Sequence, residues 1–567
     1  MPLENVADVV TALDTDLTEF SAAFTGGAYS LWLGSAISKY VVPDLDTLLE
    51  QVLELLRDNI DQTAQNCPFR AALEEVLDVA GIDNTVRNAI DLNKTVSAWP
   101  ARADIIKRLI DRYSHVLDVH PSGQDADYLV WTGLDVPNTY GDPTLEPDAE
   151  HLSVAILMLE GIGRAIQTTN WDGLIEAALA QLTSTPETIV RVVVTTDDFH
   201  KPERRSDLLK FHGCAVRARD DESTYRRLLI ARKSQISGWT TRPENRLMKE
   251  RLQYVYSTRP ALVVGLSAQD ADIHTVFNQA IENLQRNWSS SPPGVMVASQ
   301  RLGYHHKHVL RVTYGDAYAP NDTAITSASL LGAYAKPALA GLVLFTLADK
   351  LRTLLGLVPE LDASELDGLE TDLLSLRDNA ATAAGADERT FINAVIGAVS
   401  MASLIFRQGR LPTTGMVPYL PISPLPIDDA LQDPDYPKEA LGRMALALAL
   451  LSRAHNKHDW RLSAGSPSAP TEGVITVETS RGASKVFVVQ DTRESLALVL
   501  AGYTAANPDS TVVIQTNSEL PTQTRSPRSR YGRTGRTALR RVNMEDLVKT
   551  ATSADELFES FTLQGAF

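Results

Sequence analysis

The sequence predicts an α/β protein: a parallel-sheet domain, then a helical region, then a small C-terminal α/β domain. From about residue 25 to 300, short apolar runs alternate with amphipathic stretches, as strands and helices do in a parallel sheet. Further along, Ala and Leu recur at helical spacing, and after about residue 471 strand-like segments return. These changes divide the chain into residues 1–327, 328–470 and 471–567.

The elements of the first region are predicted from local patterns. Five segments have the length and composition of buried strands: Ser30–Leu33, Tyr128–Thr132, Ala165–Thr169, Ile189–Thr195 and Ala261–Leu266. Helical periodicity occurs at Leu45–Arg57, 103–118, Gly173–Leu182 and Ile273–Arg286. Strands that alternate with helices in this way favour parallel pairing.

The other two regions have distinct patterns. The second contains two long helices, at about 335–357 and 439–455, and between them a proline-dense connector at 411–429 that cannot be helical throughout. The third contains three strands and a helix, predicted at 473–479, 485–491, 511–516 and Glu494–Ala501. It is therefore a small α/β unit.

Composition and charge narrow the class of protein. Of the 567 residues, 44% are hydrophobic and 22% charged, and the formal net charge is −18. Such a negative net charge argues against a protein that coats nucleic acid without sequence preference. The apolar run at about 337–345 is too short to span a bilayer and predicts a buried helix. With an N-terminus that lacks the pattern of a secretory signal, we expect a cytoplasmic protein without membrane contact.

Cysteine usage excludes two kinds of site. Cys67 and Cys214 are the only cysteines in the sequence. Two cysteines in a chain of this length fit a reducing compartment and cannot build a disulfide framework. They also cannot supply a four-cysteine zinc site, so no zinc and no other metal is expected.

Four short segments carry the candidate chemistry, and most of them lie at or near the end of a predicted strand. They are LWLGSAISK at 31–39, IQTTNWDGLIEAAL at 166–179, LLKFHGCAV at 208–216 and ALVVGLSAQDADI at 261–273. Small residues in the first let backbone N–H groups approach a phosphate. Because ligands bind outside the carboxyl ends of parallel strands, the four segments are expected to meet in one crevice.

Each segment by itself has an ordinary structural explanation. A strand–Gly–Ser–helix turn occurs in many folds, and Asn170 or Asp172 before a helix is more often a cap than a catalyst. His212 alone is more often a hydrogen-bonded structural histidine. Asp270 is expected to cap the helix that follows it. The prediction of a functional site therefore depends on the combination.

In this order the segments resemble the sirtuin-like family. That family has a Gly-Ala-Gly-x-Ser turn, a Thr-Thr-Asn-(Tyr/Trp)-Asp segment, a Lys-x-His-Gly segment and a Val-Gly-x-Ser strand end followed by an Asp. The matching residues here are Gly34-Ser35-Ala36-Ile37-Ser38, Thr168-Thr169-Asn170-Trp171-Asp172, Lys210-Phe211-His212-Gly213 and Val264-Gly265-Leu266-Ser267 with Asp270. The resemblance covers a little under half of the chain.

The resemblance implies a Rossmann-like pocket for NAD, in which Asn170 and His212 are the catalytic residues. An amide such as Asn170 can hold water or a ribose hydroxyl, and His212 can accept a proton near neutral pH. The expected NAD-binding residues are Gly34, Ser35, Ala36, Ser38, Thr169, Asp172, Gly265 and Ser267.

Two departures from the family pattern shape the expected reaction. Ala36 replaces the second glycine of the first turn, which restricts the backbone near a pyrophosphate and affects affinity more than activity. The deacetylating members carry a four-cysteine zinc module that this chain cannot form. Water therefore becomes the expected acceptor, and nicotinamide and ADP-ribose the expected products.

The leading hypothesis is an NAD hydrolase that is activated on phage infection and depletes cellular NAD, as the resemblance to bacterial anti-phage defence proteins implies. The two further regions lack catalytic motifs and are expected to sense, oligomerise or dock a partner. A homo-oligomer and a translocase-type ATPase partner are the expected assemblies, with nucleic acid involved only indirectly. The alternatives are a non-catalytic NAD- or ADP-ribose-binding module that assembles with an ATPase, and ADP-ribosyl transfer.

Three further signals are given less weight. Gly161-Ile162-Gly163 follows a helical pattern and predicts helix packing. His305, His306 and His308 are interpreted as edge-strand histidines, because no third metal ligand is apparent, and His455 and His458 meet the same objection. The segment 524–541 holds seven arginines, and a solvated loop and a docking strip for an acidic partner remain equal alternatives.

Overall fold

The centre of the first half of the chain is a parallel β-sheet. The computed structural model describes residues 3–283, 286–288, 291–358, 362–504, 510–517 and 539–567. Among these, six strands pair in the order β3-β4-β2-β1-β5-β6, all of them parallel. Their bounds are β1 Ser30–Leu33, β2 Ala165–Thr168, β3 Val190–Val193, β4 Ser206–Lys210, β5 Ala261–Val264 and β6 Val295–Ala298. The predicted Rossmann-like α/β fold is confirmed.

Helices cover both faces of this sheet, and the side chains of β1 show why. Leu31 and Leu33 point to one face and join a hydrophobic cluster shared with α1, α9, α10 and α19. Trp32 points to the other face, where its ring meets Phe277 of α16 at 4.8 Å and Tyr256 of α15 at 5.7 Å. Because successive side chains of a strand alternate between faces, a four-residue apolar strand buries both sides at once.

The helices around the sheet fall into three groups. The two N-terminal helices are α1 Val6–Asp14 and α2 Thr18–Thr25. Helices between and after the strands are α9 Ala149–Leu159, α10 Leu174–Leu182, α11 Pro186–Ile189, α12 Ala215–Asp220, α13 Glu222–Tyr225, α14 Lys233–Gly238, α15 Arg246–Thr258, α16 Ala271–Asn283, α17 Tyr304–Tyr314 and α18 Asp322–Ala328. The third group is an insertion between β1 and β2, made of α3 Leu45–Asp58, α4 Pro68–Ala80, α5 Asn84–Asn88, α6 Arg102–Ile110, α7 Tyr113–Val116 and α8 Val136–Thr139.

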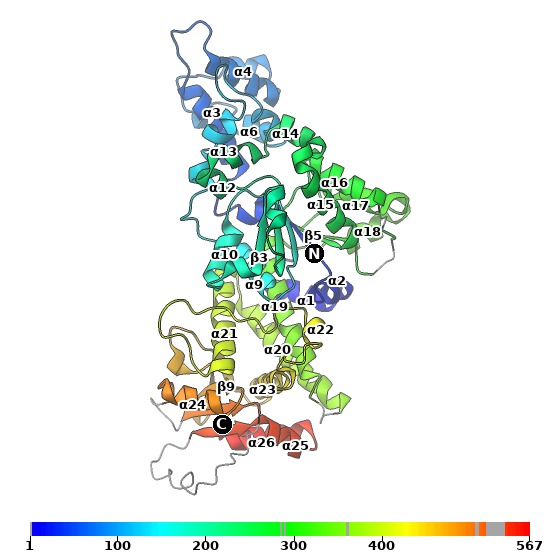
Figure 1. Ribbon diagram of the computed structural model, residues 1–567, viewed down its shortest axis with the longest axis vertical. Coiled ribbons are helices and arrows are strands. Elements are labelled where there is room, and N and C mark those ends of the chain that lie inside the picture. The colour runs from blue at the N-terminus through cyan, green and yellow to red at the C-terminus, as the bar shows by residue number, and fades with distance from the viewer. Residues whose placement is uncertain (1–2, 284–285, 289–290, 359–361, 505–509, 518–538) are drawn as a thin grey trace.

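The insertion has a hydrophobic core of its own. Apolar side chains of α3, α4 and α6 pack together with a few residues that follow β4, among them Ala215 and Leu229. Figure 1 shows α3, α4 and α6 at one end of an elongated molecule, with the six-stranded sheet below them. The insertion therefore stands over one edge of the sheet as a separate helical layer.

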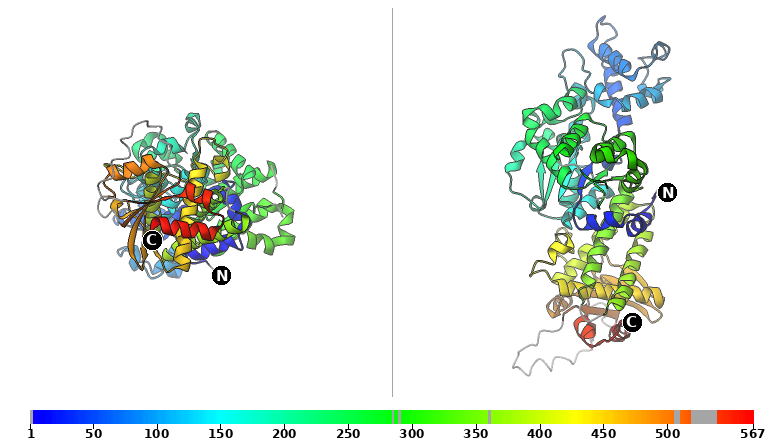
Figure 2. Two further views of the ribbon diagram at one scale, coloured as in Figure 1. Left: turned by 90° about the horizontal axis from the view of Figure 1, so that it is seen from below. Right: turned by 90° about the vertical axis from the view of Figure 1, so that its right-hand side faces the viewer.

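The second half of the chain continues away from the insertion, as the right-hand view of Figure 2 shows. Its longer helices are α19 Ala335–Leu355, α20 Ala363–Ala383, α21 Glu388–Gln408 and α23 Lys438–Lys457, with the short α22 Ile427–Ala430 at the end of the connector. A mixed sheet follows, in the order β11-β10-β9-β8-β7. Its elements are β7 Arg461–Ala464, β8 Ile475–Thr479, β9 Gly482–Val489, α24 Thr492–Leu500, β10 Thr511–Gln515, β11 Arg540–Asn543, α25 Met544–Thr550 and α26 Ala554–Gly565.

The predicted helical region and the small C-terminal α/β unit are therefore present. The first strand of the C-terminal sheet, β7, pairs with β8 and lies upstream of residue 471. One hydrophobic cluster contains side chains from α1, the six-stranded sheet, the long helices and the C-terminal sheet. Packing is therefore continuous across residue 328.

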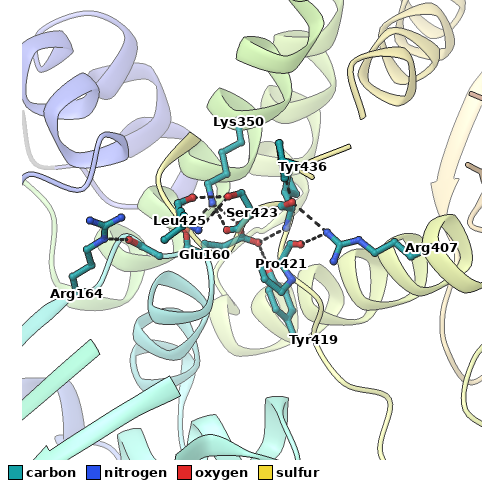
Figure 3. Close-up of polar contacts among 11 residues, drawn as sticks. Glu160, Arg164, Lys350, Arg407, Tyr419, Pro421, Ser423, Leu425 and Tyr436 are labelled. Atoms are coloured by element: carbon teal, nitrogen blue, oxygen red, sulfur yellow. Dashed lines mark hydrogen bonds and ion pairs between the residues drawn. The ribbon is translucent and has the colours of Figure 1, made fainter. Parts of the chain in front are cut away.

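A buried polar cluster joins the end of α9 to the second half of the chain (Figure 3). The Glu160 carboxylate pairs with Lys350 Nζ of α19 at 2.7 Å, and both side chains are at most 1% exposed. Tyr419 of the proline-dense connector donates its hydroxyl to the same carboxylate at 2.7 Å. Lys350 also donates to the carbonyls of Glu160 and Ser423. A buried ion pair persists only when its remaining hydrogen-bonding capacity is satisfied in this way.

Two predicted strands are wrong. Tyr128–Thr132 lies in the insertion, where Leu129–Gly133 forms a π-helical turn and packs into the insertion core. Short apolar runs fit a buried helical turn as well as a strand, and this one packs among the helices of the insertion. The histidines at 305–308 lie on α17 rather than on an edge strand, because Val309, Leu310 and Thr313 form a buried helical face.

Two strands of the first sheet were not predicted. One is β6, and the other is β4, whose sequence SDLLK contains two ionisable residues. Asp207 of β4 is buried by a two-bond pair with Arg191 of β3, at 2.8 Å for each bond. Lys210 at its end is 1% exposed and bonds to Glu176. Charges that are paired across elements can occupy a central strand, and no local pattern indicates this.

Three remaining predictions concern single segments. Residues 518–538, which include most of the arginine-rich stretch, lie outside the described residues. Within the part of the chain that is described, α21 is the one helix long and apolar enough to cross a membrane. It packs on α9, α19, α24 and β9, and a core helix passes the same test, so it does not establish a membrane span. The predicted buried helix around 337–345 is part of α19 and is buried.

Candidate functional site

The four candidate segments follow four adjacent strands. In the sheet order these strands are β4, β2, β1 and β5, and all run in the same direction. Their carboxyl ends therefore meet along one edge, below the helical insertion. From β1 the chain leads to β2 on one side of β1, whereas β5 pairs with β1 on the other side. The strand order therefore changes direction at β1. Open α/β sheets bind ligands at such a topological switch point.

A cavity of ≈ 480 Å³ lies between this edge and the insertion. Its volume is within the usual range for small-molecule sites. The insertion supplies mainly apolar walls, including Leu48, Tyr113 and Leu134. Nine of the ten predicted site residues line it: Ser35, Ala36, Ser38, Thr169, Asn170, Asp172, His212, Gly265 and Ser267.

Gly34 is the predicted residue that does not line the cavity, and its role is to permit close packing. A Cβ atom there would lie 2.4 Å from the Leu266 Cα and 2.6 Å from the Gly265 carbonyl oxygen. Gly265 has φ +67°, and a Cβ on it would meet the Ile37 nitrogen at 2.9 Å. The Ala36 N–H donates to the Gly265 carbonyl at 3.2 Å. The turns after β1 and β5 therefore pack directly against each other, and the Ala36 N–H is already hydrogen-bonded to the protein backbone.

Asn170 is held by Ser38 in a buried hydrogen-bond network. Its Nδ2 donates to Ser38 Oγ at 3.1 Å, and Ser38 donates to Asp172 Oδ2 at 2.9 Å. The other carboxylate oxygen of Asp172 accepts from the Leu174 N–H at the start of α10. Asn170 Oδ1 is buried and has no hydrogen-bond partner among the described residues. A buried acceptor without a partner is costly, so this oxygen is suited to accept a hydrogen bond from a ligand.

His212 forms a buried pair with Asp272, which sequence reasoning did not select. His212 Nε2 lies 2.8 Å from Asp272 Oδ2, and the two side chains are 4% and 1% exposed. Burial lowers the pKa of His212, but the carboxylates of Asp272 and Asp270 raise it more, so its pKa is above the ordinary value. With Nε2 engaged by Asp272, Nδ1 is the ring nitrogen left for a ligand in the cavity.

Asp270 stands immediately before α16, as expected for a cap, but its carboxylate has a different partner. The Tyr113 hydroxyl, from the insertion, donates to Asp270 Oδ1 at 2.9 Å. Burial raises the pKa of Asp270, and the pKa of Tyr113 is raised by burial and by the Asp270 charge. This bond ties the insertion to the edge of the sheet beside His212.

His212, Asp270 and Asp272 have ligand atoms within 4.8 Å of one another, a grouping that could hold a cation. The hydrogen bonds above already engage all three side chains. A metal ion would have to displace the His212–Asp272 bond. The geometry therefore favours a histidine oriented by a carboxylate over a metal centre.

Four residues that contact or support the cavity residues were not among the candidates predicted from the sequence. Asp272 is inside the fourth segment, two residues after Asp270, and its position in the first turn of α16 was the available signal. Tyr113 and His151 come from helices remote in sequence, and nothing local distinguishes them. His306 of α17 bonds through Nε2 to the Leu266 carbonyl at 2.8 Å and so supports the cavity wall.

Comparison with known proteins agrees with this geometry. Residues 164–318 match the family model described as a SIR2-like domain. The match begins just before β2 and includes β4 and β5, with Asn170, His212 and Asp272. No curated protein matches the chain. The match leaves out β1 and its turn, which the sheet places between β2 and β5. Through residues 164–318, this chain carries a SIR2-like domain.

Proposed function

We propose that this protein hydrolyses NAD at the bond between nicotinamide and ribose. One observation carries the proposal: Asn170 Oδ1 is buried without a hydrogen-bond partner among the described residues, and it lines the same cavity as His212, whose Nε2 is engaged by Asp272. A binding module needs no basic nitrogen oriented by a buried carboxylate. SIR2-like domains use NAD, which makes NAD the substrate to consider first.

The residues around the cavity suit the parts of NAD. Ser35, Thr169 and Ser267 offer hydroxyl groups for phosphate or ribose oxygens. Lys39, which also lines the cavity, offers a positive charge for the pyrophosphate. Leu48 and Leu134 give apolar surface, and Tyr140 gives an aromatic ring, for contact with a base. Because the Ala36 N–H is bonded to Gly265, phosphate binding by the first turn would rely on Ser35 rather than on that amide.

The proposed reaction needs a positioned water molecule and a base. Water attacks the ribose carbon, the carbon–nitrogen bond breaks, and its electron pair neutralises the positive charge of the nicotinamide ring. Asn170 Oδ1 would hold the water or a ribose hydroxyl, and His212 Nδ1 would accept the proton. The products are nicotinamide, ADP-ribose and a proton. Nicotinamide leaves as a neutral molecule, so no strong general acid is required.

The second half of the chain supports a regulated enzyme. An NAD hydrolase without control would harm its host, and the long helices and the C-terminal sheet contribute no residue to the cavity lining. We propose that they sense or dock a partner, and that activation on phage infection depletes NAD in the cytoplasm. A homo-oligomer and a translocase-type ATPase remain the proposed partners, without membrane contact and with nucleic acid acting only through such a partner.

The test is release of nicotinamide and ADP-ribose from NAD by the purified full chain. It is run alone, with a candidate ATPase, and with lysate from phage-infected cells. Asn170→Ala and His212→Ala are each expected to lower turnover by about 10²–10⁴-fold, the usual contribution of a positioned acid–base group. His120→Ala changes an exposed histidine and is expected to match wild type. Absence of release in every condition contradicts the hydrolase. Release of nicotinamide without free ADP-ribose would indicate ADP-ribosyl transfer.

A further inference from the structure

A buried histidine outside the four candidate segments contacts the catalytic network. His151 lies in the first turn of α9 and is 0% exposed. Its Nε2 lies 3.0 Å from Ser38 Oγ, the atom that also bonds Asn170 and Asp172. Every residue of α9 is buried, so the ring is held by the core and has no route to solvent.

The contacts of His151 determine which ring nitrogen carries the hydrogen. The Asp148 backbone N–H points at His151 Nδ1 at 3.1 Å, so Nδ1 must accept. Burial lowers the pKa of His151 although the carboxylates of Asp172 and Asp148 raise it, and the net direction is downward. The neutral ring therefore has its one hydrogen on Nε2, and Nε2 donates to Ser38 Oγ.

This assignment uses every hydrogen-bonding position of the Ser38 hydroxyl. Its hydrogen goes to Asp172 Oδ2, and its two lone pairs accept from His151 Nε2 and Asn170 Nδ2. Ser38 therefore has no hydrogen to give to Asn170. The Asn170 amide must present Nδ2 to Ser38, which leaves Oδ1 as the atom without a partner.

We propose that His151 is a positioning residue for the reaction: through Ser38 it fixes the orientation of the Asn170 amide, so that an acceptor rather than a donor faces the substrate. The proposal rests on the proposed NAD hydrolysis and names a residue that does not itself contact the substrate. Without the His151 donor, the Ser38 hydroxyl can turn its hydrogen toward Asn170. The amide can then flip and present Nδ2 to the water that it should hold.

The first experiment compares His151→Phe, which keeps the size of the ring, with His151→Gln, which restores an N–H donor. His151→Phe is expected to lower kcat about 10–100-fold with KM changed less than about threefold, because orientation for catalysis is lost and binding groups remain. His151→Gln is expected to recover at least half of that loss on a logarithmic scale. Equal kcat in wild type and His151→Phe overturns the proposal, as does a Gln variant no better than Phe.

The second experiment separates action through Ser38 from general damage to the fold. If His151 acts only through Ser38, the double variant Ser38→Ala/His151→Phe has the kcat of Ser38→Ala alone. Independent losses that multiply would overturn the proposal. His455→Phe, which alters a histidine of α23 bonded to the Trp460 carbonyl, is the matched control and is expected to keep full activity. Circular dichroism checks that each variant is folded, and if His151→Phe is not, Gln and Ser38→Ala carry the comparison.

A neutron crystal structure of His151→Phe, which distinguishes the amide nitrogen of Asn170 from its oxygen, tests the same inference without turnover. The expected result is that Asn170 Oδ1 rather than Nδ2 faces Ser38 Oγ, with the backbone of both loops unchanged. An Asn170 Nδ2 that still donates to Ser38 Oγ, as it does at 3.1 Å in the wild type, overturns the role of His151. A wild-type protein that never releases nicotinamide contradicts the proposed function instead, so the two failures are distinguishable.

Discussion

At the scale of single residues, the chemistry of the cavity depends on how two side chains, His212 and Asn170, are oriented. His212 is oriented through Nε2 by Asp272, and Asn170 through Nδ2 by Ser38. In both, one polar atom is committed to the protein and the other is left for a ligand. Such preorganisation would favour the proposed reaction, because neither side chain has to reorient.

Asp272 is expected to set the pH dependence of activity. Its charge raises the pKa of His212, so a reaction that needs neutral His212 rises with pH through a midpoint above the ordinary histidine value of about 6.5. In Asp272→Asn that influence is removed while burial still lowers the pKa, so the acidic limb of kcat/KM moves to lower pH. We also expect kcat at the plateau to fall about 10–100-fold, because the ring loses its orientation. A pH–rate profile from pH 5 to 9 measures both, and an unmoved limb contradicts the assignment.

Glu150 of α9 is expected to reduce stability at alkaline pH. It is 2% exposed, and burial raises its pKa to about 8. The pKa of Glu150 is higher in the folded chain than in the unfolded chain. The free energy of unfolding therefore has its full value below the unfolded-state pKa of Glu150 and falls as pH rises through about 8. Glu150→Gln is therefore expected to equal wild type at pH 4 and to exceed it by about 2–4 kcal/mol above pH 8.5. Denaturant unfolding at several pH values measures this, with the exposed Glu559→Gln as control.

At the scale of elements, the site depends on two turns that approach each other after β1 and β5. The Gly34 N–H bonds the Val264 carbonyl at 3.0 Å, and the Ala36 N–H bonds that of Gly265. These bonds extend the strand pairing by one step beyond the sheet. They help to position Ser38 and Ser267, which both line the cavity.

Gly34→Ala is expected to damage the site by steric conflict. The added Cβ would lie 2.4 Å from the backbone of Leu266, and backbone atoms cannot move aside as a flexible side chain can. We expect a loss of NAD affinity of about tenfold or more and a lower thermal midpoint. Gly356→Ala is the matched control, since the nearest atom to its Cβ is 3.5 Å away. Calorimetric titration with NAD and thermal unfolding measure the two effects; normal binding by Gly34→Ala would show that the turns can separate.

At the scale of the whole molecule, α9 connects the cavity to the second half of the chain. Its first turn holds His151 against Ser38, and Glu160, directly after its last turn, forms the buried pair with Lys350 (Figure 3). Helix α19, which carries Lys350, also packs against α1. The six-stranded sheet and the long helices thus share one core, and we do not expect the two halves to unfold independently.

Lys350 is expected to be essential to the packing between the two halves of the chain. Lys350→Met leaves Glu160 charged in a buried site, and breaking a buried pair costs about 3–5 kcal/mol. Glu160→Gln/Lys350→Met removes both charges and is expected to recover about half of the loss or more. Urea unfolding of the full chain measures the difference. A double variant no more stable than Lys350→Met would show that the hydrogen bonds of Lys350 to the Glu160 and Ser423 carbonyls, rather than its charge, hold the two halves together.

Much of this protein could be predicted from its sequence because the determining signals are local. Short segments rich in apolar residues indicate β1, β2, β3 and β5, and a parallel sheet brings the loops after its strands to one edge. The four segments and the pair Asn170 and His212 followed from that. Where the local signal is ambiguous or cancelled, as in the π-helical turn at 129–133 and the charged strand β4, prediction failed because tertiary partners decide the outcome.

The tertiary structure alone decided which residues assist those two side chains. His151 is 113 positions from Ser38, and Tyr113 is 157 positions from Asp270. The sequence contains no periodicity or motif that links such pairs, because they meet only after the sheet, the insertion and α9 have packed together. The sequence by itself therefore determined the fold class and the resemblance to SIR2-like domains, and it indicated the two candidate side chains. The packing determined their orientation, since a hydrogen bond between distant segments exists only in the folded chain.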